Sequence, residues 1–253
     1  AGGPLAVLII AIVASELGKA VSKETRVDIL VTPLVTIFSG VGLSMLIAAP
    51  IGAAASQVGT LIMWATEQAP LVMGILVSVI VGVALTLPIS SAAICNALGL
   101  TGLAGGAAVA GCCAQMIGFA LMSYKENGVG GLVSQGLGTS MLQMGNIVKN
   151  PRIWIAPTLA SAITGPLATC VFHFEMNGAA VSSGMGTCGL VGQIGVYTGW
   201  VSDIAAGTKA AITPMDWAAM VLLCFVLPAV LSVIFCEIER KLGWIKEGDL
   251  KLN

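Results

Sequence analysis

Charged side chains are scarce in this sequence. Only 9% of its 253 residues are Asp, Glu, Lys or Arg, against about 25% in a typical soluble domain. A soluble protein of this length needs a charged surface, so the composition excludes that class. The 11 basic and 12 acidic residues give a formal net charge of −1. This balance leaves no basic surplus for binding a nucleic acid.

Metal ligands and catalytic motifs are also scarce. The chain has a single histidine, and none of its seven cysteines forms a C-x-x-C pair, so the spacing of a metal site is absent. No H-E-x-x-H, G-x-S-x-G, Walker A or dinucleotide-binding fingerprint occurs in a usable context. We therefore expect no metal, no cofactor and no catalytic residue in this chain. The cysteines are expected to be small buried residues of a reduced protein.

Long uncharged segments are what the sequence has in abundance. Hydrophobic residues make up 57% of the chain. The windows 29–66 and 68–124 contain no charged residue and are separated only by Glu67. A membrane-spanning helix needs about 20 apolar residues, and the runs are continuous rather than alternating, which disfavours a membrane barrel. The sequence predicts an all-α, polytopic membrane protein with roughly seven spans and with broken or re-entrant segments. The predicted spans are 3–18, 30–55, 70–89, 101–123, 152–174, 185–201 and 214–237.

Basic residues between the spans predict the orientation of the chain. The connection 19–28 (KAVSKETRVD) and the tail after the last span contain most of the Lys and Arg residues, and such segments face the cytoplasm. We predict one transmembrane domain over 1–237 and a cytoplasmic tail over 238–253, in a bacterial inner membrane. The sequence begins without Met inside an apolar stretch, so upstream residues are expected to be missing.

Two segments interrupt the apolar pattern with Pro, Gly and small polar residues. The first break covers 85–106 and contains Pro88; the second covers 172–195 and is rich in glycine. Non-helical backbone at membrane depth is tolerated where protein buries it or where it lines a watery cavity, and broken segments in a transporter mark its substrate site. The candidate binding residues in these breaks are Ser90, Ser91, Asn96, His173, Glu175, Asn177, Ser182, Ser183 and Gln193.

Each candidate also has a plainer interpretation. Isolated glycines let helices pack closely, and a single His173 is often a structural residue with satisfied hydrogen bonds. Glu175 is a functional hypothesis if it lies inside the membrane, but it also fits the membrane surface where the span 152–174 ends. The segment 124–151 is uncharged between Glu126 and Lys149 and is amphipathic; it is either an interfacial helix or a re-entrant connection.

Three stretches of the sequence resemble a known family. They are PISSAAICNALGLTGLAGGAAVAG (88–111), GNIVKNPRIWIAPTLASAITGPLAT (145–169) and SSGMGTCGLVGQIGVY (182–197). They are similar to the EIIC-like membrane proteins of the bacterial sugar phosphotransferase system, and more narrowly to the perfringolysin-regulator (PfoR-like) branch. In this family the EIIC part carries a sugar across the membrane while a separate cytoplasmic EIIB domain phosphorylates it.

The resemblance implies a function and partners for this chain. We expect a permease for a sugar or a similar small polar solute, working by alternating access in the lipid bilayer, as a homodimer with a separate EIIB-type protein. Family members hold sugar hydroxyls with acidic and His residues near a re-entrant hairpin, and here Glu175, His173 and Asn177 fit that setting. The chain has no phosphorylation domain of its own, so enzyme activity is left open. The alternative is a membrane-embedded sensor or regulator that binds a small molecule without transporting it.

Overall fold

The computed structural model describes residues 3–24 and 27–252. Over these residues the chain is helical, and its one β-bridge joins Gly102 to Met176. The α-helices are α1 (Gly3–Val21), α2 (Asp28–Gln68), α3 (Pro70–Thr86), α4 (Ser91–Leu98), α5 (Gly102–Met122), α6 (Tyr124–Val133), α7 (Met144–Lys149), α8 (Ile155–Pro166), α9 (Val191–Ala205), α10 (Pro214–Val221) and α11 (Leu227–Lys241). The predicted all-α fold is therefore confirmed.

Short 3-10 and π-helical turns connect or extend several of these helices. The 3-10 turns are η2 (Ser140–Gln143), η3 (Pro151–Trp154), η5 (Ala180–Gly184) and η6 (Cys188–Leu190), and the π-helical turns are η1 (Ser134–Gly138), η4 (Leu167–Val171) and η7 (Leu222–Val226). Two of these turns lengthen α8 into one helix over Pro151–Val171, and η7 joins α10 to α11. The irregular turn η1 lies inside the segment 124–149, and η5 and η6 lie inside the glycine-rich break 172–195.

Among the described residues, four helical segments are long and apolar enough to cross a membrane. They are Asp28–Gln68, Gly102–Met122, Pro151–Val171 and Pro214–Lys241, while α3 is apolar but has only 17 residues. The spans predicted over 101–123, 152–174 and 214–237 agree closely with three of them. The chain is thus a multi-pass membrane protein. The predicted domain boundary at residue 237 falls inside α11, which continues to Lys241.

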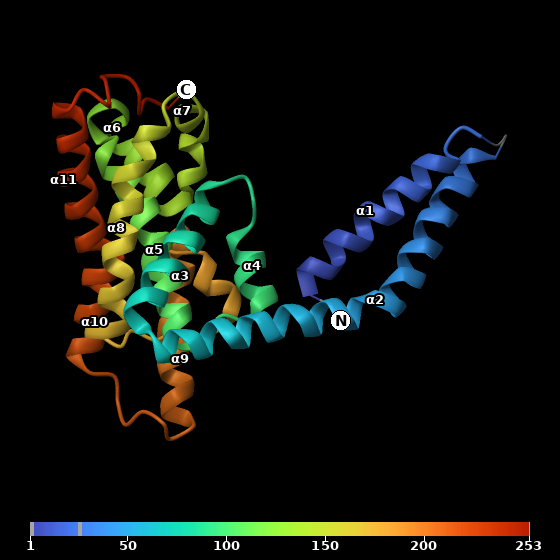
Figure 1. The fold of residues 1–253 in the computed structure, drawn as a ribbon, viewed down its shortest axis with the longest axis horizontal. Coiled ribbons are helices and arrows are strands. Elements are labelled where there is room, and N and C mark those ends of the chain that lie inside the picture. The colour runs from blue at the N-terminus through green and yellow to red at the C-terminus, as the bar shows by residue number, and fades with distance from the viewer. Residues whose placement is uncertain (1–2, 25–26, 253) are drawn as a thin grey trace.

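Helix α5 is the centre of a bundle formed with α3, α8 and α11 (Figure 1). In the apolar 18-residue stretch of α5, 89% of the residues are buried inside the protein. Small residues explain this position, because a Cβ atom at Gly111 would overlap the backbone carbonyl of Ser78 in α3. Close backbone approach of this kind is how membrane helices pack in place of a hydrophobic driving force.

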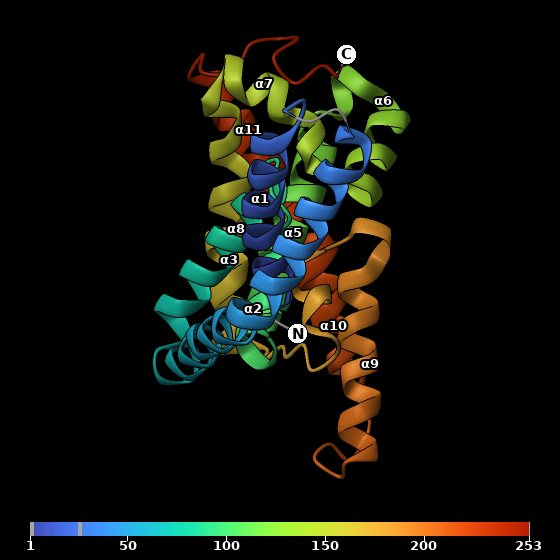
Figure 2. The same ribbon diagram turned by 90° about the vertical axis from the view of Figure 1, so that its right-hand side faces the viewer.

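The first two helices form a pair that extends away from this bundle (Figure 1). Figure 2 shows the same pair from its own side, lying in front of the bundle. Helix α2 has 41 residues, with Pro33 and Pro50 inside it, and a proline removes one helical hydrogen bond and favours a bend. Ile29 and Met45 on α2 are more than four-fifths exposed, as suits side chains that face lipid.

The segment 172–205 enters and leaves the bundle at the same end. Met176 exchanges two backbone hydrogen bonds of 3.1 Å with Gly102 at the start of α5, and Gln193 reaches Cys113, eleven residues further along that helix. Helix α9 then returns, and Asn177 binds Asp203 near its end. The predicted span over 185–201 is therefore wrong: residues 185–190 are irregular, and α9 forms one arm of a re-entrant hairpin.

The segment 124–149 enters from the opposite end of the bundle. Gln135 donates a 2.8 Å hydrogen bond to the hydroxyl of Ser123, the residue that ends α5. Further inside, the Thr187 hydroxyl donates to the Gly136 carbonyl at 2.5 Å. Two irregular segments thus run along α5 from opposite ends and meet near its middle. The re-entrant interpretation of 124–151 agrees with this geometry.

The residues after α11 fold back against the same end of the bundle. The side chains of Asn127 and Gln143 donate hydrogen bonds of 2.8 and 3.0 Å to the Leu250 carbonyl, and Asn146 donates one of 3.0 Å to Lys251. Leu250 itself is fully buried. The tail is therefore an ordered cover over α6 and α7 rather than a free extension.

Candidate functional site

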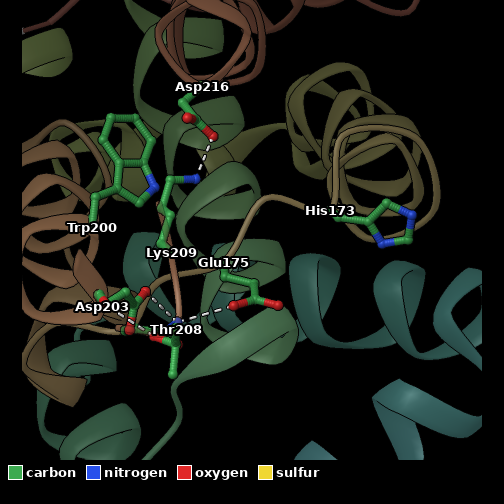
Figure 3. A pocket seen from close by; sticks show the side chains of 8 residues that line it. His173, Glu175, Trp200, Asp203, Thr208, Lys209 and Asp216 are labelled. Atoms are coloured by element: carbon green, nitrogen blue, oxygen red, sulfur yellow. Dashed lines mark hydrogen bonds and ion pairs between the residues drawn. The ribbon is translucent and has the colours of Figure 1, made fainter. Parts of the chain in front are cut away.

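A polar cavity of about 470 Å³ opens at the end of the bundle where the hairpin 172–205 enters. It contains three predicted site residues, His173, Glu175 and Asn177. The structure adds five lining residues to these three: Trp200, Asp203, Thr208, Lys209 and Asp216 (Figure 3). Residues from the segment before η5, from α9, from the loop between α9 and α10 and from the start of α10 therefore form a single site.

Asn177 holds two carboxylates of the cavity together. Its side-chain nitrogen donates hydrogen bonds of 3.0 Å to Glu175 and 2.9 Å to Asp203. Its side-chain oxygen accepts a 3.1 Å hydrogen bond from the backbone of Gly102. Both donors of the amide and one acceptor position are used, so Asn177 positions the carboxylates. The remaining lone pairs of Glu175 and Asp203 are the groups left for a ligand.

A cation occupies the other side of the cavity. The ammonium of Lys209 lies 2.8 Å from a carboxylate oxygen of Asp216 and 5.8 Å from the ring centroid of Trp200. Asp216 in turn caps α10 together with Thr213, each accepting a hydrogen bond from the other's backbone. Because Asp216 compensates Lys209, the two carboxylates beside Asn177 carry the uncompensated negative charge of the site.

His173 has a different setting from Glu175. Figure 3 shows its imidazole turned away from the carboxylates and from Lys209. Its backbone has φ of 44°, a left-handed conformation that non-glycine residues adopt rarely, mostly at turns. His173 therefore marks the sharp turn at which the chain leaves the end of the long helix and begins the hairpin.

Glu175 lies at the end of the bundle rather than in its interior. The side chain is exposed, and it follows the membrane-crossing segment Pro151–Val171 by four residues. The cavity also borders the start of the segment Pro214–Lys241. This geometry favours the alternative in which the carboxylate lies at the membrane surface, where hydration lowers the cost of its charge.

The residues of the first break lie apart from this cavity. Ser90 caps α4 by accepting a hydrogen bond from the backbone of Ala93, and the Ser91 hydroxyl donates to the Gly184 carbonyl at 2.6 Å. Asn96 is exposed on α4. Pro88 and Ser90 line a separate apolar groove of about 930 Å³ between α4 and the first two helices. Ser90, Ser91 and Asn96 therefore do not belong to the polar cavity.

The last three candidates are buried inside the bundle. The Ser183 hydroxyl donates a 2.7 Å hydrogen bond to the Leu100 carbonyl, Ser182 packs against Gly195, and Gln193 contacts Cys113. They line neither the polar cavity nor the groove. Ser183 is satisfied as a structural residue, whereas Gln193 keeps a carbonyl oxygen with no hydrogen-bond partner among the described residues.

Three charged residues of the cavity are not among the residues predicted from the sequence, although their spacing in the sequence could have indicated them. Between the uncharged windows 176–202 and 217–236, the charged residues are Asp203, Lys209 and Asp216. All three line the cavity. In a chain this poor in charge, a short loop with three charged side chains next to a break is itself a marker of a polar site.

A second, smaller cavity lies at the opposite end of the bundle. It has a volume of about 320 Å³ and is lined by residues of the segment 124–149 and of the tail, namely Ser134, Leu142, Gly145, Asn146, Lys251 and Leu252. Its single charged residue is a lysine, whereas the first cavity carries three carboxylates. The two ends of the bundle therefore present cavities of different charge.

Comparison with known proteins identifies the family. No curated protein and no solved structure matches the chain. The sequence model described as "Phosphotransferase system, EIIC" matches residues 1–252, nearly the whole chain. With its helical membrane bundle and two broken segments, the chain belongs to the EIIC family of the phosphotransferase system.

Proposed function

We propose that this chain is a permease that carries a sugar or a similar small polar solute across the bacterial inner membrane by alternating access. The observation that supports this most directly is the pair of polar cavities at opposite ends of the bundle. Between them, two irregular segments meet at Thr187 and Gly136. Irregular backbone around a central barrier is the arrangement that transporters use for alternating access.

The distribution of basic residues supports an orientation. We call the larger cavity, which contains Glu175, Asp203 and Asp216, the acidic cavity. Among its lining residues Lys209 is the one Lys or Arg side chain. The opposite end, where α6, α7 and the end of α11 lie (Figure 1), carries five basic residues: Lys125 in α6, Lys149 in α7, Arg152 in η3, and Arg240 and Lys241 in α11. Basic residues near span ends favour the cytoplasmic side. We infer that the tail is cytoplasmic and that the acidic cavity opens to the outside.

The acidic cavity suits a solute that is rich in hydroxyl groups. Glu175 and Asp203 accept one hydrogen bond each from Asn177, and a carboxylate has room for several more donors. Charge-assisted hydrogen bonds of this kind are about twice as strong as neutral ones. Glu175 and Asp203 are the proposed solute acceptors, with Asn177 as their positioning residue and His173 at the turn.

The finer features of the resemblance remain predictions. They are the narrower perfringolysin-regulator branch, the homodimer and the separate EIIB-type partner. The remaining candidates, Ser90, Ser91, Asn96, Ser182, Ser183 and Gln193, do not line the acidic cavity. They would meet a solute only during its passage through the bundle.

Counterflow in proteoliposomes tests the proposal without needing phosphorylation. Vesicles loaded with unlabelled D-glucose, D-fructose or D-mannitol should accumulate the labelled compound for at least one of the three. Glu175→Gln should reduce this exchange at least tenfold, because the neutral amide loses the charge-assisted hydrogen bonds. The matched control is Glu67→Gln, since Glu67 is an exposed acid outside the cavity.

The same experiment separates a transporter from a sensor. A sensor binds one of the three compounds to the purified protein but shows no counterflow. If Glu175→Gln exchanges solute as fast as Glu67→Gln does, the assignment of the acidic cavity is wrong.

A further inference from the structure

The middle of the bundle separates the two cavities by buried protein. The cavities share no lining residue. Between them the hydroxyl of Thr187 donates to the carbonyl of Gly136, and both residues are buried. Any solute that passes from one cavity to the other must cross this layer.

Sulfur atoms supply several of the polar contacts in this layer. One turn of α5 presents Cys112, Cys113 and Met116 to the second broken segment. The Thr187 hydroxyl contacts the Met116 sulfur at 3.6 Å, and the Cys112 thiol lies 3.9 Å from the Ser183 carbonyl. The amide nitrogen of Gln193 lies 3.2 Å from the Cys113 sulfur. Thiols and thioethers are weak donors and acceptors. Thr187 and Ser183 also donate to carbonyl oxygens, whereas the hydrogen bond of the Gln193 side chain goes to a sulfur atom.

Within this layer, Gln193 is the side chain with a polar atom that lacks a hydrogen-bond partner among the described residues. It is 8% exposed. Its amide nitrogen has two N–H donors, and the hydrogen bond found for it goes to the Cys113 sulfur. Its carbonyl oxygen is buried and has no partner among the described residues. Buried polar groups are nearly always hydrogen-bonded, so the carbonyl oxygen of this amide is free to accept a hydrogen bond from a ligand.

We propose that Gln193 is the central binding point for the solute during its passage, and that it recognises two adjacent hydroxyl groups. One hydroxyl donates to the free carbonyl oxygen of the amide. Its neighbour accepts from the amide nitrogen and replaces the weak contact with the Cys113 thiol. The ligand class is a neutral polyhydroxyl compound, a sugar or a hexitol. The inference rests on the proposed transport function and adds a site in the barrier, reached when Thr187 and Gly136 separate.

Equilibrium binding to the purified full chain tests this site. The probes are labelled D-glucose, D-fructose and D-mannitol, and the probe with the highest affinity is used for all variants. Gln193→Met keeps the length of the side chain but removes its polar groups, and it should weaken binding about tenfold. Cys113→Ser should weaken binding about threefold, because a hydroxyl at this position satisfies the amide better than a thiol does. Cys236→Ser is the control, a buried cysteine in another cluster.

The outcomes distinguish the inference from the function on which it rests. If both Gln193→Met and Cys113→Ser bind the probe as Cys236→Ser does, the central site is wrong while the permease proposal stands. If the wild-type chain binds none of the three probes, the permease proposal fails and the central site fails with it. If Gln193→Met does not fold, as judged by gel filtration, the result for Cys113→Ser decides.

Discussion

Replacement of Asn177 by alanine is the sharpest perturbation of the acidic cavity. The two oxygens that accept from its amide nitrogen lie about 5 Å apart, because they bind the two hydrogens of one NH₂ group. Two unit charges at this distance repel by about 3 kcal/mol at an effective dielectric constant of 20 and by about 1 kcal/mol in water. In the wild-type protein the amide hydrogens stand between Glu175 and Asp203 and offset this repulsion.

Asn177→Ala exposes that repulsion and also removes the contact with Gly102. Since Glu175 is exposed, the lower part of the range applies, and we expect a loss of about 1–2 kcal/mol. For a chain of this length that corresponds to roughly 3–6 °C in melting temperature. Thermal unfolding in detergent measures it, with Asn96→Ala as the control, because Asn96 is exposed on α4.

A second substitution makes the test specific for charge. Glu175→Gln in the Asn177→Ala background removes one of the two charges, so it should restore at least half of the lost stability. Such a coupling is what a double-mutant cycle measures for residues in one network. Equal melting temperatures of Asn177→Ala and Asn96→Ala, or strictly additive losses in the double variant, would refute the assigned role of Asn177.

Two further predictions concern the bundle itself. Gly111→Ala places a methyl group against the Ser78 backbone and should destabilise the protein by about 1–3 kcal/mol. Gly130 has open space around it, so Gly130→Ala should not destabilise the protein. The melting temperatures of the two variants test the difference. Glu239 is 4% exposed, and neither carboxylate oxygen has a partner among the described residues. Glu239→Gln should therefore raise stability by about 1 kcal/mol, whereas the exposed Glu247→Gln should change it little; equal melting temperatures would contradict this.

The membrane class and the long helices could be predicted from the sequence because they depend on local composition. About 20 apolar residues without charge form a helix in a bilayer whatever their neighbours are. The breaks were predictable for the same reason, since Pro88 and the glycines of 182–195 interrupt helices locally. The proximity of Glu175 and Asn177 also follows from sequence, because the two residues are two positions apart.

The path of the chain through the bundle could not be predicted in the same way. Helix α9 has the composition of a span, but the contacts of Asn177 with Asp203 and of Gln193 with Cys113 return it to the end where the hairpin began. These contacts join residues 26 and 80 positions apart, and no periodicity encodes them. For the same reason the sequence could not assign Asp203 and Lys209 to the site.

The contact between Thr187 and Gly136 offers the most direct test of the transport path. In a chain carrying Thr187→Cys and Gly136→Cys, a short bis-methanethiosulfonate, which forms one reducible disulfide with each cysteine, should join the two irregular segments, with the wild-type chain and each single variant treated in parallel. A permease that opens at this contact must lose counterflow of the labelled sugar when the segments are joined and regain it after reduction. Undiminished counterflow in the cross-linked protein would contradict the account.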